Sequence, residues 1–190
     1  MAHPPVTRFV KRSQLEHIIR AATTIADDDE LIIVGSQAVL GQFPDAPAEL
    51  LVSVEADVYP RNHPERWELI DGSLGELSPF HDTFGYYAQG VEPGTALLPA
   101  GWESRLVTIQ GPGTRGAKGL CLEIHDLLLS KYVAAREKDR HFCRVAVRCG
   151  LVDPAVLLER VPTLPVREDA RLRVATLVRD DVLATRSLPP

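Results

Sequence analysis

The sequence predicts an α/β fold in which short strands alternate with helices and the C-terminal part is helical. Four short segments are apolar or alternate between apolar and polar residues, which is typical of strands. They are residues 31–34, 50–59, 106–110 and 120–124. Apolar residues recur at helical spacing near the N-terminus and through the C-terminal third. The 190 residues fit one ordinary domain, or a core over residues 1–125 with a helical part over residues 126–190 packed on it.

Composition indicates a soluble globular protein. Hydrophobic residues make up 45% and charged residues 25% of the chain, and the net charge of −5 argues against a protein that coats nucleic acid. The stretch from Lys131 to Arg148 is either a local basic face or a solvated helical face. No apolar run approaches the ~18 residues of a membrane span, so we expect a cytoplasmic protein without membrane contact. Three cysteines without a Cys-x-x-Cys pair predict reduced, packed thiols.

Capping and hydropathy predict the N-terminal elements. Ser13, with Glu16 three residues later, predicts a capping box that opens an amphipathic helix. The acidic run at residues 27–30 predicts a solvated turn without chemistry. A buried strand over residues 31–34 and a short helix over residues 36–43 follow.

The segment at residues 50–59 predicts a strand with one apolar and one polar face. The apolar face carries Val52, Val54, Ala56 and Val58, and the polar face carries Ser53, Glu55, Asp57 and Tyr59. Pro60 ends this strand, because proline has no N–H to donate to the sheet. Pro64 fits the first position of a helix that ends before Pro79.

The aromatic stretch at residues 80–87 favours packing at strand positions, with nucleobase stacking as the alternative. The strands over residues 106–110 and 120–124 are joined by a Gly-rich turn and predict a hairpin.

A helix is expected from Asp126 onward, because apolar residues follow at helical spacing to about Gly150. This helix places Lys131 and Asp139 near one face, at positions separated by about two turns. Short helices separated by prolines come next, and a last amphipathic segment covers residues 169–183.

Glu55 and Asp57 carry the strongest chemical signal in the chain. Side chains two residues apart on a strand point to the same face, so these carboxylates lie side by side and suit a divalent metal. The Gly35-Ser36 pair follows an apolar strand and lets the backbone approach a phosphate closely, and the next helix adds amide donors. Together they predict Mg²⁺-assisted phosphoryl or nucleotidyl transfer, the alternative being acids that merely face water at a strand edge.

The run Leu31–Ser36, followed by Val54–Val58, resembles the signature of the nucleotidyltransferase superfamily of DNA polymerase β. That signature is Gly-Ser or Gly-Gly, a spacer, and two acidic residues alternating with apolar ones. Downstream, His125–Asp139 is similar to the helical Lys and Lys-Asp motif of compact bacterial members, among them the AbiEii-type toxins. The resemblance covers about residues 31–140 and implies a mixed β-sheet flanked by helices.

The resemblance also implies roles for individual residues. Glu55 and Asp57 would hold Mg²⁺, and Gly35 and Ser36 would bind the phosphates of an NTP substrate. Glu55 stands where Asp is commoner in the family, which leaves a non-catalytic module that binds nucleotide, RNA or a partner as the alternative.

Three residues of the second half complete the expected site. Glu123, at the end of the strand over residues 120–124, is a candidate third carboxylate, or else a surface Glu before a helix. Lys131 matches the family's helical Lys and would act as a point charge on the phosphates. Asp139 has an active-site role by resemblance, or pairs with a neighbouring base such as Arg136.

The expected activity is transfer of a nucleoside monophosphate from NTP to an acceptor hydroxyl. The acceptor is a tRNA 3′ end, a protein side chain or a small molecule such as an aminoglycoside. Similarity to the toxin-type members favours tRNA as the acceptor and a cognate antitoxin as a partner.

Overall fold

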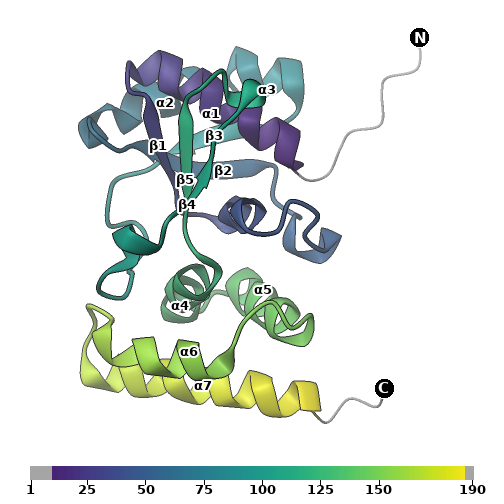
Figure 1. Cartoon of the computed structure of the whole chain (residues 1–190), viewed down its shortest axis with the longest axis vertical. Helices are drawn as coiled ribbons and strands as arrows, with labels where there is room; N and C mark the ends of the chain where they lie inside the picture. The colour runs from purple at the N-terminus through teal and green to yellow at the C-terminus, as the bar shows by residue number, and fades with distance from the viewer. Residues whose placement is uncertain (1–9, 187–190) are drawn as a thin grey trace. The chain divides into compact units, whose positions relative to one another are not determined.

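The computed structural model describes residues 10–186, which form two compact units (Figure 1). The first unit comprises the chain up to Thr95 together with Leu106–Leu122, and the second comprises Ala96–Arg105 together with the chain from Glu123 onward. The α/β class, the mixed sheet flanked by helices and the helical C-terminal part are confirmed.

The first unit is built on a five-stranded mixed sheet in the order β3-β2-β1-β5-β4. Its strands are β1 (Glu30–Ile33), β2 (Glu55–Pro60), β3 (Tyr87–Gly90), β4 (Val107–Ile109) and β5 (Lys118–Cys121). The pairs β1–β2 and β4–β5 are antiparallel, whereas β1–β5 and β2–β3 are parallel. The hairpin predicted around the Gly-rich turn is therefore confirmed as β4–β5.

Helices α1 (Arg12–Ala26) and α2 (Trp67–Leu74) lie side by side against the sheet, and α3 (Pro79–Phe84) follows α2 (Figure 1). Short 3₁₀ helices make up the rest of the regular structure of this unit. They are η1 (Ser36–Gly41), η2 (Ala48–Leu50), η3 (Pro64–Arg66) and η5 (Pro112–Thr114). The helix predicted over residues 36–43 is thus a 3₁₀ helix rather than an α-helix.

The expected N-terminus of the first helix is wrong by two residues. Lys11 is the N-cap of α1, and its backbone N–H donates to the Gln14 side chain at 2.8 Å. Glu16 instead accepts from Arg12 at 3.1 Å, one turn apart on the helix surface. The capping box therefore uses a Gln three residues after the cap, which satisfies an otherwise unpaired amide equally well.

The strand expected over residues 50–59 is shorter than its alternation indicates. Only Glu55–Pro60 pairs in the sheet, because residues 48–50 form η2 and the chain from Leu51 to Val54 has no partner strand over its length. From Glu55 to Val58 the alternation holds, since Ala56 and Val58 are fully buried and Glu55 and Asp57 are half-buried on the opposite face, whereas Tyr59, expected on the polar face, is buried (7% exposed).

The acidic run at residues 27–30 is not merely a solvated turn. Asp28 is buried and accepts hydrogen bonds from the backbone N–H groups of Glu30, Asn62 and His63 and from the Asn62 side chain. Burial opposes ionisation of Asp28, but these hydrogen bonds outweigh it and lower its pKa. Asp28 therefore ties the α1–β1 turn to the chain that leaves β2.

The aromatic stretch lies mostly on a helix, so its expected strand conformation is wrong before residue 87. Phe80 and Phe84 on α3 pack against Tyr86 and against His17 of α1, with ring centroids between 4.6 and 6.0 Å apart. Ser78 caps α3 by accepting from the His81 N–H, and Pro79 occupies the first helical position. These rings thus pack on one another within the first unit.

The second unit is helical. Its elements are η4 (Trp102–Arg105), α4 (Ile124–Ala134), α5 (Glu137–Arg148), α6 (Pro154–Arg160), η6 (Val161–Thr163) and α7 (Glu168–Arg186). Helix α7 packs on α4, α5 and α6 (Figure 1). Asp181 of α7 is buried and accepts from the hydroxyl of Tyr132 at 2.9 Å and from Arg140 at 2.8 Å, which fixes α7 to both α4 and α5.

The single helix expected from Asp126 to about Gly150 is in fact two helices. Ala135 adopts a left-handed conformation (φ 51°) and its N–H donates to the Lys131 carbonyl, which ends α4. Arg136 is extended and becomes the N-cap of α5, whose first turn carries Glu137 and Asp139. Acidic residues in a first turn favour a helix start, so Glu137 and Asp139 are the signal in the sequence that marks the beginning of α5.

Cys121 and Cys143 are buried as predicted, but Cys149 is exposed, so the expectation of three packed thiols is wrong for it. Over residues 10–186, no helix has both the length and the apolar character that a membrane crossing requires.

Candidate active site

Gly35 and Asp57 come together at one end of the sheet, as the sequence predicts for a Gly-Ser corner followed by an acidic strand. The Ile33–Val58 pair is the last of the β1–β2 register, and the Val34 N–H then donates to the Asp57 carbonyl at 3.0 Å. A Cβ built on Gly35 would lie 2.2 Å from Asp57 Oδ2 and 2.8 Å from Asp57 Cγ. Only glycine therefore fits here with the Asp57 carboxylate in place, and the reason is close approach, since Gly35 has an ordinary extended backbone (φ −84°, ψ −170°).

Glu55 and Asp57 lie on the same face of β2, as alternation requires. Glu55 is in register with Tyr87 of β3, and the Tyr87 hydroxyl donates to Glu55 Oε2 at 2.8 Å. Burial and the negative charges around it, first that of Glu55, raise the pKa of Tyr87, so the hydroxyl stays protonated and acts as a donor. No local pattern in the sequence assigns Tyr87 to the site.

Ser36 begins η1 directly after Gly35, so the corner between β1 and η1 carries both residues of the predicted phosphate site. Gln37 follows and is fully buried, with its side-chain N–H donating to the Ser53 carbonyl at 2.8 Å. Gly35 and Asp57 are thus in contact within the first unit, with Ser36 next to Gly35 in the chain and Glu55 on the same face of β2 as Asp57.

The two carboxylates of β2 are the donors that a metal ion at this corner would use. Among residues 10–186, no group of three or more His, Cys, Asp or Glu side chains is arranged to hold a metal ion. Two carboxylates are nevertheless the donor set that Mg²⁺ uses with nucleotides, because this ion keeps several waters and takes its remaining ligands from substrate phosphates. Glu55 and Asp57 therefore fit Mg²⁺ rather than a fully protein-coordinated ion.

Lys131 and Asp139 meet in the second unit across the break between α4 and α5. Lys131 Nζ lies 3.2 Å from Asp139 Oδ1 and 4.7 Å from the centre of the Phe142 ring. Arg136 Nε lies 2.6 Å from Asp139 Oδ2, so the expected alternative pairing also forms, although Asp139 is buried (1% exposed). Burial opposes ionisation of Asp139, but Arg136 and Lys131 outweigh it and lower its pKa.

Glu123 is not on a strand, because β5 ends at Cys121, and it is instead the N-cap of α4. Its carboxylate accepts from the His125 backbone and ring, and from Arg160 Nη1 at 2.6 Å. The His125 Nε2 accepts from the Asp153 N–H, so its Nδ1 carries the proton that is donated to Glu123. Arg160 also bonds the fully buried Asp126, and these contacts hold α6 against the start of α4.

The pH dependence of stability follows from the Glu123 environment. Burial disfavours the charged form, but the hydrogen bonds from His125 and Arg160 outweigh it and bring the pKa of Glu123 to about 2, from 4.5. Because the folded pKa is depressed, the contribution of Glu123 is complete above about pH 4.5 and is lost as the pH falls toward 2.

We therefore expect the difference in unfolding free energy between wild type and Glu123→Gln to be largest at neutral pH and to shrink between pH 4.5 and 2. Urea titrations followed by Trp102 fluorescence, in a Trp67→Phe background, measure this in the second unit. A difference in unfolding free energy that stays constant between pH 4.5 and 2 would contradict a lowered pKa for Glu123 in the folded protein.

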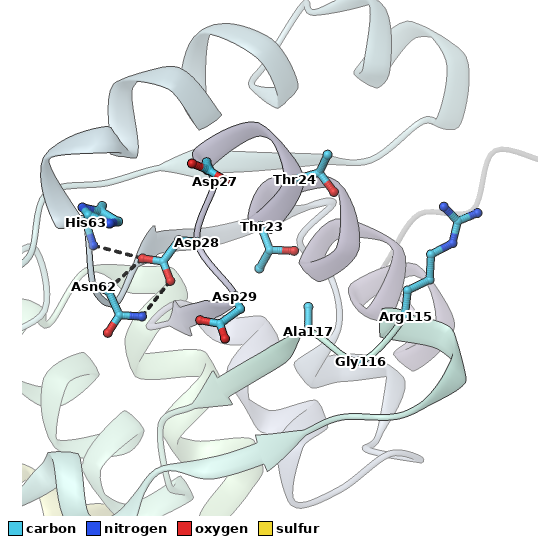
Figure 2. A pocket seen from close by; sticks show the side chains of 10 residues that line it. All are labelled: Thr23, Thr24, Asp27, Asp28, Asp29, Asn62, His63, Arg115, Gly116 and Ala117. Atoms are coloured by element: carbon cyan, nitrogen blue, oxygen red, sulfur yellow. Dashed lines mark hydrogen bonds between the residues drawn. The ribbon is translucent and has the colours of Figure 1, made fainter.

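A groove of about 730 Å³ lies at the other end of the same sheet (Figure 2). It is lined by Thr23, Thr24, Asp27, Asp28, Asp29, Asn62, His63, Arg115, Gly116 and Ala117. These residues flank the start of β1 and the start of β5, whereas Gly35 follows the end of β1. Figure 2 shows Asp28 turned to Asn62 and His63, whose backbone N–H groups donate hydrogen bonds to it. None of the predicted site residues is among those that line the groove.

Tyr87 and Arg160 are the interacting residues that the sequence did not reveal. Tyr87 reaches Glu55 through the parallel β2–β3 pairing, and Arg160 reaches Glu123 and Asp126 from a helix some 35 residues further along the chain. Both contacts join segments far apart in sequence, and no local pattern encodes such a pairing.

Comparison with known proteins agrees with this geometry. The family described as "Nucleotidyltransferase of unknown function (DUF6036)" matches residues 13–180, a span that includes every predicted site residue. Neither the curated proteins nor the solved structures yield a match. The glycine-acid corner and the family match agree, and the chain belongs to the DUF6036 family of nucleotidyltransferases.

Proposed function

We propose that the protein transfers a nucleoside monophosphate from an NTP to an acceptor hydroxyl in a Mg²⁺-dependent reaction that releases pyrophosphate and the proton of the hydroxyl. The observation that carries the proposal is the contact between Gly35 and the Asp57 carboxylate, with Glu55 on the same face of β2. Because Gly35 has no side chain, the Asp57 carboxylate lies directly against its backbone, so backbone amides and a carboxylate are close together. Phosphates bind to backbone amides and their Mg²⁺ binds to carboxylates, so a metal-bound triphosphate needs both groups in one place.

Each residue has a defined task in this proposal. The Gly35-Ser36 corner binds the phosphates through its backbone and the Ser36 hydroxyl, and fixes their position relative to β2. Glu55 and Asp57 are the Mg²⁺ ligands. Mg²⁺, when bound, neutralises charge on the reacting phosphate and orients it for attack by the acceptor hydroxyl. The roles expected for Glu123, Lys131 and Asp139 stay predictions, and Ala variants in the same assay test them.

For the acceptor we propose the 3′ end of tRNA, as the resemblance to AbiEii-type toxins suggests, together with an antitoxin as the protein partner. A basic surface on α5 supports RNA as the substrate. Lys138, Arg144 and Arg148 are exposed, whereas Phe142 and Val145 on the same helix are buried. Exposed basic side chains along one helix face are suited to a phosphate backbone.

The test is incubation of the full chain with each of the four NTPs labelled at the α-phosphate, Mg²⁺ and total tRNA. We expect label on tRNA with wild type and none with Asp57→Ala. If expression of the wild type also arrests growth and the same variant does not, the toxin assignment is supported. Nucleotide binding without transfer to any acceptor would instead favour a non-catalytic binding module.

A further inference from the structure

We propose that Tyr87 is a positioning residue that fixes the Glu55 carboxylate for metal binding through the hydrogen bond from its hydroxyl. This inference rests on the proposed function, because it takes Glu55 to be a Mg²⁺ ligand. It concerns a residue of β3, the next strand after β2 along the chain, to which the proposed function assigns no contact with the phosphates.

The geometry places Tyr87 directly beside Glu55. The two residues are register partners in the parallel β2–β3 pair, so their side chains leave the sheet on the same face. The Tyr87 hydroxyl lies 2.8 Å from Glu55 Oε2, and Tyr87 is buried, at 6% exposure. A buried hydroxyl at this distance holds one carboxylate oxygen in a single place.

Tyr87 is itself held by α3. The ring of His81 packs on the Tyr87 ring with centroids 4.7 Å apart. His81 Nδ1 accepts from the Leu77 N–H at 3.1 Å, so its orientation is fixed by the turn that precedes α3. The turn before α3 thus holds His81, His81 packs against Tyr87, and Tyr87 holds the Glu55 carboxylate.

This support explains why Glu can serve at the first acidic position. A Glu side chain has one more rotatable bond than Asp, and ordering it for metal binding costs additional conformational entropy. A neighbouring hydroxyl that fixes the carboxylate beforehand reduces this cost at the moment of binding. Groups that hydrogen-bond a metal ligand typically change metal affinity about 10- to 100-fold when removed.

The neighbouring Tyr86 provides a matched control. It is buried to a similar extent, at 8% exposure, and its hydroxyl also makes a side-chain hydrogen bond, to His17 Nδ1 at 2.7 Å. Successive residues near a strand point to opposite sides, and Tyr86 faces α1 and α3 rather than Glu55. Tyr86→Phe therefore removes a buried hydroxyl of the same kind without touching the site.

The experiment is titration of the full chain with Mn²⁺ alone, followed by the electron paramagnetic resonance signal of the free ion. We expect Tyr87→Phe to weaken Mn²⁺ binding by about 10-fold or more, Tyr86→Phe to match wild type, and Asp57→Asn to lose binding. Equal affinity of Tyr87→Phe and wild type, with binding lost in Asp57→Asn, overturns the inference and leaves the proposed function standing. Binding that survives unchanged in Asp57→Asn overturns both.

A second set of variants keeps the inference testable if Tyr87→Phe also lowers stability. In a Glu55→Asp background the shorter carboxylate no longer reaches the Tyr87 hydroxyl, so adding Tyr87→Phe should weaken Mn²⁺ binding less than about twofold further. An equally large loss in both backgrounds would mean that Tyr87 acts through general stability, and would overturn the positioning role.

Discussion

Gly35→Ala is expected to reduce nucleotidyl transfer about 100-fold or more while the fold is retained. The added methyl would lie 2.2 Å from Asp57 Oδ2 and 3.0 Å from Asp57 Cβ, so the carboxylate has to move by about 1 Å to reach ordinary contact. Displacements of this size at a reacting centre typically cost that much in rate. Steady-state transfer from α-labelled NTP, together with thermal unfolding, measures the two effects separately.

Gly72→Ala is the control for this variant. Gly72 lies within α2, and apart from the adjoining helix backbone no atom lies within 4 Å of its Cβ position. Activity should be unchanged, and the protein should become more stable by up to about 1 kcal/mol, because Ala replaces Gly inside a helix. Full activity in Gly35→Ala would mean that the Asp57 carboxylate can move without consequence, and it would remove Asp57 from the reaction.

Asp126→Ala is expected to cost about 3 kcal/mol of stability in the second unit. Asp126 is fully buried and accepts from Arg105 Nε at 2.8 Å, Arg105 Nη2 at 3.1 Å and Arg160 Nη1 at 2.8 Å. Without the carboxylate, the two arginines lose their shared partner, and the Ala96–Arg105 segment loses its tie to α4. The estimate takes the lower end of the range for buried ion pairs, since both arginines keep some contact with water.

Trp102 lies in the segment that Asp126 holds, which makes it a direct reporter. Urea unfolding followed by Trp102 fluorescence in the Trp67→Phe background should show the full loss. Asp169→Ala removes the partner of an Arg in an exposed pair, Arg167–Asp169, with side chains 91% and 67% exposed, and should change the midpoint little. Equal losses of stability in Asp126→Ala and Asp169→Ala would contradict the role of Asp126 in holding this segment to α4.

The sequence predicted those parts of the fold that local patterns encode. The buried strand after α1 and the alternation of Glu55 and Asp57 around Ala56 depend only on residue order, and both are confirmed. The extension of that strand back to residue 50 is wrong, because alternation cannot tell whether a partner strand is present. The strand expected for the aromatic run at residues 80–87 is also wrong, because the Ser78-Pro79 cap starts a helix there.

The break at Ala135 has a different cause. No Gly or Pro marks it, and the apolar spacing of α4 continues into α5 almost without interruption. As a result Lys131 and Asp139 come together at 3.2 Å across a turn rather than along one helix face.

The candidate site also has one part that local sequence patterns predict and one part that they do not. Gly35 and Asp57 come together because β1 and β2 are antiparallel neighbours, and the register of this pair places the residues that follow Ile33 beside those that precede Val58. Tyr87 joins Glu55 through a pairing between strands more than 25 residues apart, which depends on the tertiary fold and not on any motif.

The most direct test of the account is a crystal structure of the full chain with Mg²⁺ and an NTP analogue that cannot be cleaved between the α- and β-phosphates. The account predicts the phosphates on the backbone of Gly35 and Ser36, with Mg²⁺ bound by Glu55 and Asp57. Phosphates and metal bound elsewhere on the protein, with those two carboxylates contacting neither, would contradict it.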